Sequence, residues 1–134
     1  MKYLAGVAAS ASAVVLAACG HAEPITPNTA PPANPGRLNG VSASQLVDAI
    51  TKAGLPAPNA RDVTAPNCQQ ARCIQEIDTD TVSILKFPGT GPAQLYEGAM
   101  TNVYQVEDLV LVFAPGVTAD SRRDYERVAE HLVK

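Results

Sequence analysis

The chain has 134 residues, with 13 acidic against 10 basic side chains, a net charge of −3 and an aromatic content of 4%. This acidic balance argues against nucleic-acid binding, whose affinity depends on Lys and Arg contacts to phosphate. The scarcity of aromatic side chains, with no Trp, weighs against a stacking pocket for sugars or bases.

The first element is an apolar leader. Lys2 precedes a run of Ala, Val, Leu and other small residues over 3–18, and Cys19 follows it. A transmembrane helix needs about 20 residues to cross the bilayer, so this run is short for one. A basic start, an apolar centre and small residues at the end are typical of a signal peptide. We therefore expect residues 1–18 to be cleaved.

The four residues Leu16-Ala17-Ala18-Cys19 resemble the lipobox of bacterial lipoproteins. The resemblance implies that the Cys19 thiol receives a diacylglyceryl group, that cleavage occurs before Cys19, and that the new amine is acylated, for example with palmitate. Several acyl chains together hold a protein firmly to a membrane. We thus expect a lipid anchor on the extracytoplasmic face of the cell membrane. The alternatives are ordinary cleavage near Ala18 with secretion, and an uncleaved signal anchor.

Residues 19–37 form the expected tether between lipid and domain. The stretch HAEPITPNTAPPANPGR contains five prolines and almost no bulky apolar side chain. Such a composition favours extended polyproline II structure and buries too little surface to fold. The sequence therefore predicts a disordered, Pro-rich spacer.

Residues 38–134 are expected to form one small domain. Ser42 and Gln45 match a capping box at the start of a helix that Gly54 ends. A short helical turn at Asn67 and a strand at 79–87 are predicted next, followed by a helix from Pro92 whose apolar side is formed by Leu95, Tyr96, Ala99 and Met100. Two strands at 103–106 and 109–113 are then predicted to join as a hairpin. The last predicted element is a helix capped by Thr118, with an inward face formed by Tyr125, Val128, Ala129 and Leu132.

The order helix, strand, helix, strand, strand, helix predicts an α+β fold. We expect a two-layer sandwich with helices packed on a three- or four-stranded mixed sheet, in which the strand-helix-strand unit forms a right-handed parallel crossover. An additional strand would come from residues 61–64 or 74–77.

Cys68 and Cys73 are predicted to form a disulfide. In an exported protein, two cysteines of the mature domain usually pair, and the remaining cysteine, Cys19, would carry the lipid. The alternatives are a redox centre, a metal site and free thiols. A redox centre usually has the spacing C-x-x-C, and a metal site needs further soft ligands.

Other polar patterns are weaker. Glu76, Asp78 and Asp80 alternate, a spacing that would place three possible calcium ligands on one face of a strand. The glycine and the distal glutamate of an EF-hand loop are missing, so a charged strand edge is the favoured interpretation. His131 lies near a helix end where its charge suits the dipole. We expect no catalytic residue, no cofactor and no metal.

The linker, the two-cysteine loop and the final domain also resemble the layout of small actinobacterial lipoproteins of unknown function. This resemblance implies no site residue beyond Cys19. The leading hypothesis is a non-catalytic envelope module that contacts another membrane or wall protein. The alternative is a carrier or sensor for a small ligand such as a lipid or peptide, and an enzyme is the least favoured class.

Overall fold

The computed structural model describes residues 39–134. The expected signal peptide at 1–18, Cys19 and the tether at 19–37 lie outside these described residues. The helices are α1 (Ala43–Lys52), α2 (Thr64–Ala71), α3 (Thr90–Ala99) and α4 (Ala119–Val133), and the strands are β1 (Arg61–Asp62), β2 (Gln75–Asp78), β3 (Val82–Lys86), β4 (Val103–Val106) and β5 (Leu109–Phe113). The α+β class is therefore confirmed.

The sheet differs from the expected one in size and pairing. Five strands lie in the order β1-β2-β3-β5-β4, and every neighbouring pair is antiparallel. The prediction of three or four strands in a mixed sheet was wrong. Both regions proposed as a source of one more strand contribute one, as β1 and β2, and α2 is a helix of eight residues rather than a single turn.

The two strands of the expected crossover are parallel, as predicted, but they are not neighbours in the sheet. β3 and β4 both run antiparallel to β5, so they are parallel to each other, but β5 lies between them. The physical reason is burial. β5 reads Leu-Val-Leu-Val-Phe and is almost fully buried on both faces, and an apolar strand of this kind gains most at an inner position of the sheet.

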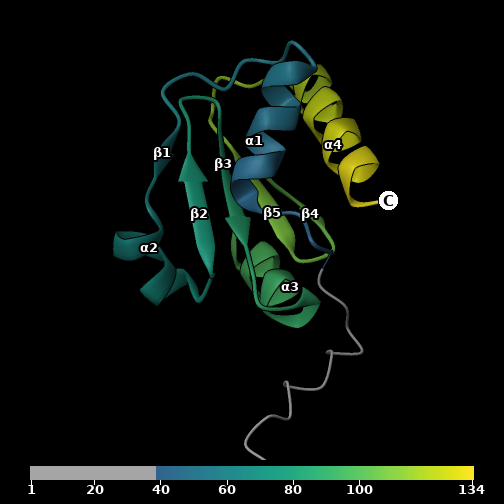
Figure 1. The fold of residues 1–134 in the computed structure, drawn as a ribbon. Coiled ribbons are helices and arrows are strands. Elements are labelled where there is room, and N and C mark those ends of the chain that lie inside the picture. The colour runs from purple at the N-terminus through teal and green to yellow at the C-terminus, as the bar shows by residue number, and fades with distance from the viewer. Residues whose placement is uncertain (1–38) are drawn as a thin grey trace, which may run out of the picture. The chain divides into compact units, whose positions relative to one another are not determined.

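Helices cover both faces of the sheet, which makes three layers rather than the two that we expected (Figure 1). One core joins α1 and α4 to the sheet through alternate strand residues such as Ile84 and Leu111. The other core joins α2 and α3 to the opposite face through Leu85 and Val110. The switch between faces follows from the two-residue period of a strand.

Several local predictions are confirmed. The Gln45 backbone N–H donates to Ser42 Oγ (3.1 Å), the Ser42 N–H donates to the Gln45 side chain (2.8 Å), and Gly54 has a φ of +80° after the end of α1. The Ser121 N–H donates to Thr118 Oγ1 at the start of α4 (3.2 Å). These ends were predictable because helix capping depends on residues only a few positions apart.

The prediction for the apolar side of α3 was right at Tyr96 and wrong at Leu95, Ala99 and Met100. Its buried residue is Ala93, with Tyr96 packed beside it, whereas 78% of Leu95 and 43% of Met100 are exposed. The helix begins at Thr90, two residues before Pro92, and Gly89 is its N-cap. It therefore rests on the sheet through a small side chain and leaves two bulky apolar ones facing solvent.

Candidate functional site

The groove between α1 and α4 is the first candidate site. It has a volume of about 750 Å³ and is lined by Ala49, Lys52, Ala53, Leu55, Asp124, Arg127, Val128, His131 and Leu132. These residues lie near one another because α1 and α4 pack side by side over the same face of the sheet. The groove thus follows the line of contact between the first and last helices of the domain.

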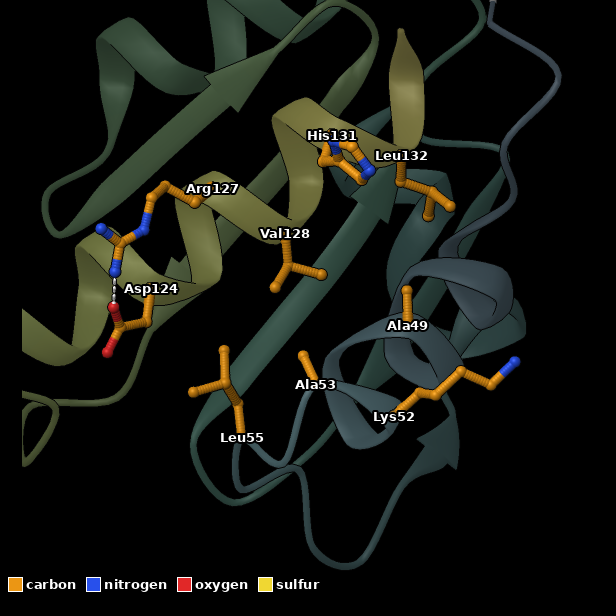
Figure 2. A pocket seen from close by; sticks show the side chains of 9 residues that line it. All are labelled: Ala49, Lys52, Ala53, Leu55, Asp124, Arg127, Val128, His131 and Leu132. Atoms are coloured by element: carbon orange, nitrogen blue, oxygen red, sulfur yellow. Dashed lines mark hydrogen bonds and ion pairs between the residues drawn. The ribbon is translucent and has the colours of Figure 1, made fainter.

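The floor of this groove is apolar and shallow. Figure 2 shows Val128 pointing from α4 toward Leu55 and Ala53 at the end of α1. Three apolar residues of the floor are partly buried because they also pack against the core between α1, α4 and the sheet; they are Leu55, Val128 and Leu132. Small residues on α1, Ala49 and Ala53, leave the hollow open.

Charged side chains border the floor. Arg127 is paired with Asp124 one turn earlier on α4, and Lys52 extends outward from the end of α1 (Figure 2). An exposed i,i+3 pair of this kind contributes little to stability. His131 lies at the same border, but within residues 39–134 it forms no hydrogen bond with Asp124 or Arg127. The groove therefore offers an apolar contact area with charged edges.

A second groove lies between α2 and α3 on the other face of the sheet. Its volume is about 940 Å³, and its lining includes Arg72, Pro92, Leu95, Tyr96 and Met100. The exposed apolar residues of α3 thus belong to a hollowed surface, rather than standing isolated. Sequence periodicity missed this surface because it assigned Leu95 and Met100 to the core.

Cys68 and Cys73 are joined in a disulfide, as predicted. Cys68 is the buried residue of α2, and Cys73 lies two residues before the start of β2, so the bond ties α2 to the segment that leads into that strand. Both cysteines pack against Phe87 and Leu85 in the second core. The bond holds a helix with few apolar residues against the sheet.

The Glu76 carboxylate lies beside this disulfide. Glu76 is only 8% exposed, its Oε1 accepts a hydrogen bond from Asn67 Nδ2 (3.2 Å), and its Oε2 lies 3.9 Å from Cys73 Sγ. Burial raises the pKa of Glu76, while the Asn67 bond partly opposes that rise. The cluster of Cys68, Cys73 and Glu76 has metal-ligand spacing, but paired sulfurs have no thiolate to offer a metal.

The three alternating acids do not form one cluster in the structure. Asp78 Oδ2 pairs with Arg61 (2.7 Å), and Asp80 Oδ2 accepts from Asn59 Nδ2 (2.6 Å). Glu76 and Asp78 lie on β2, but Asp80 lies in the turn before β3. Each acid therefore has its own partner, and the charged-edge interpretation fits Asp78 with Arg61 on the adjoining edge strand.

In the part of the chain from 39 to 134, no helix is long and apolar enough to cross a membrane. Comparison with models of protein families, with curated proteins and with solved structures returns no match to this chain. The functional argument therefore depends on the residues and their geometry alone.

Proposed function

We propose that this protein is an exported lipoprotein whose folded domain is a non-catalytic contact module of the cell envelope. Cys19 would carry the lipid, residues 20–37 would act as the spacer, and the domain would bind another envelope protein. The observation that carries this proposal is the α1–α4 groove, an apolar floor with charged edges on the surface of the domain. Contact sites commonly combine an apolar centre with a polar rim.

The filling of the interior supports a contact module over an enclosing carrier. The two cores between the helices and the sheet are occupied by buried side chains such as Leu46, Ile84 and Phe87. A small-ligand carrier remains the second candidate because a volume of about 750 Å³ falls in the usual range of ligand pockets. In that case the ligand would lie in the open groove between α1 and α4.

The lipid anchor is tested by mass spectrometry of the N-terminal peptide of protein purified from its own cells. We expect cleavage before Cys19 and the added mass of a diacylglyceryl group. The Cys19→Ser variant should leave the membrane fraction. An unmodified Cys19 with membrane association unchanged in Cys19→Ser would contradict the anchor.

The contact function is tested separately by crosslinking in living cells. A photoreactive residue at Lys52, on the edge of the α1–α4 groove, should capture one dominant envelope protein. Ala53→Arg, which fills the groove, should abolish that capture. The matched variant Ala65→Arg, at an exposed alanine of α2, should not affect it. Equal capture in both variants would exclude this groove as the contact surface.

A further inference from the structure

The two edges of the sheet differ in how well they are protected. β1 is only two residues long, consists of the charged pair Arg61 and Asp62, and Arg61 is held by Asp78 at 2.7 Å. β4, at the opposite edge (Figure 1), reads Val-Tyr-Gln-Val and carries neither a charge nor a proline. Charges, prolines and short length are the usual means by which edge strands avoid further pairing.

Alternate residues of β4 direct their backbone groups away from the sheet. The Phe113 N–H donates to the Asn102 carbonyl (2.8 Å), which makes that pair hydrogen-bonded. Since hydrogen-bonded and non-bonded pairs alternate along an antiparallel ladder, Tyr104 and Val106 bond to β5. The N–H and C=O groups of Val103 and Gln105 therefore point to the open side of the edge.

The surroundings of this edge are acidic. Tyr104 Oη donates to Glu130 Oε1 on α4 (2.5 Å). Burial first, then this hydrogen bond, and then the negative charges of Glu130 and Glu126 raise the pKa of Tyr104 to about 12. Glu107 is exposed in the turn that follows β4. Among residues 39–134, none of these three glutamates forms an ion pair with a cation.

The three arginines of α4 have other contacts. Arg123 pairs with Asp120 and Arg127 pairs with Asp124, each one turn earlier on the same helix. Arg122 lies over the Phe113 ring, 5.5 Å from its centroid. None of these three arginines therefore forms an ion pair with an acid beside β4.

We propose that β4 accepts an extended segment of a partner protein by strand addition, and that the segment carries Lys or Arg to meet Glu126 and Glu130. Backbone pairing at Val103 and Gln105 provides the attachment, and the acidic side chains select the partner. A second copy of the chain fits less well, because pairing β4 with itself about Tyr104 brings the two sets of glutamates together. This inference rests on the proposed contact function and adds a second contact surface, the β4 edge, to the α1–α4 groove.

The experiment selects linear decapeptides, displayed on phage as a random library, against the purified full chain in mild detergent. We expect the selected peptides to be rich in β-branched residues and in Lys or Arg. Their binding should slow amide exchange at Val103 and Gln105 in the NMR spectrum. Failure to enrich any peptide, or enrichment without basic residues, would overturn the proposal.

Three variants sharpen the test. Gln105→Pro removes an outward N–H without removing a bond to β5, and should weaken the selected peptides roughly tenfold. Glu126→Lys changes a half-buried helix position, leaves the backbone of β4 intact, and should weaken them roughly fivefold. Asp48→Lys makes the same charge change at an exposed position of α1 and should have no effect. Equal affinity for Glu126→Lys and Asp48→Lys would exclude the acidic selection.

The two proposals fail in distinguishable ways. If peptides bind at β4 but crosslinking in cells captures no partner, the edge site stands and the envelope function is lost. If a partner is captured at the α1–α4 groove and no peptide binds at β4, the function stands and strand addition is excluded.

Discussion

Lys86 Nζ lies 2.7 Å from Asp108 Oδ2, and both residues are buried at the end of the sheet. Lys86 Nζ also donates to the backbone and side-chain oxygens of Asn39 (2.8 and 3.0 Å), and Asn39 Nδ2 donates to Asp108 Oδ1 (2.7 Å). The pair therefore fixes the first described residue of the domain to β3 and to the β4–β5 turn.

Breaking this pair should destabilise the domain strongly. Lys86→Met leaves the Asp108 carboxylate buried without its cation, which typically costs about 3–5 kcal/mol. Urea unfolding measures the loss. The control is Arg61→Met, which breaks the exposed pair with Asp78 and should cost less than about 1 kcal/mol. A loss for Lys86→Met as small as the control's would show that the buried pair contributes little.

Removing the disulfide should have a moderate effect. The bond between Cys68 and Cys73 spans five positions, and closing a loop of that length stabilises by about 2 kcal/mol on the chain-entropy model. Cys68→Ala/Cys73→Ala should lower the melting temperature, and reductant should lower that of the native protein by a similar amount. Hydrogen exchange should localise the change to α2. Unchanged melting in reductant would mean that the bond carries no stability.

The Glu76 carboxyl should make stability depend on pH. Burial raises the pKa of Glu76 in the folded protein above its ordinary value of 4.5, so the folded state binds the proton more tightly than the unfolded state does. Stability from this group is therefore present below pH 4.5 and is lost as the pH rises through the folded pKa. The unfolding free energy of Glu76→Gln minus that of the native protein should increase over this interval.

Asp62 provides the control of opposite sign. Hydrogen bonds from Thr64 lower the pKa of Asp62 below 3.8, so its contribution is present above that pH and is lost as the pH falls through the folded pKa. Asp62→Asn should therefore lose relative stability as the pH rises. The same sign for Asp62→Asn and Glu76→Gln would contradict the assigned causes.

Tyr104 should ionise late in an alkaline titration. Burial first, and then the bond and charge of Glu130, raise the pKa of Tyr104 to about 12. The phenolate absorbance of the native protein should therefore show a transition near pH 12. This transition should be absent in Tyr104→Phe and should shift to lower pH in Glu130→Gln. Because the unfolded phenol ionises near pH 10, stability from this group falls between about pH 10 and pH 12. A late transition unchanged by Glu130→Gln would place its cause elsewhere.

Local sequence signals determined the elements that depend on neighbouring residues. The capping box at Ser42 and Gln45, the end of α1 at Gly54 and the hairpin turn at 107–108 were all predictable from residues a few positions apart. Pairing of Cys68 with Cys73 was predicted by counting cysteines on the expectation that the chain is exported. Each of these features has its physical cause within a short stretch of sequence.

Only the tertiary structure decided the layers, the strand order and the candidate surfaces. The placement of β5 between β3 and β4, and the burial of Ala93 in place of Leu95, depend on partners far away in the sequence. The α1–α4 groove joins residues from the first and last helices, which no local pattern connects. Local periodicity tells which residues share a face of an element, but the face that becomes buried is chosen by packing against distant elements.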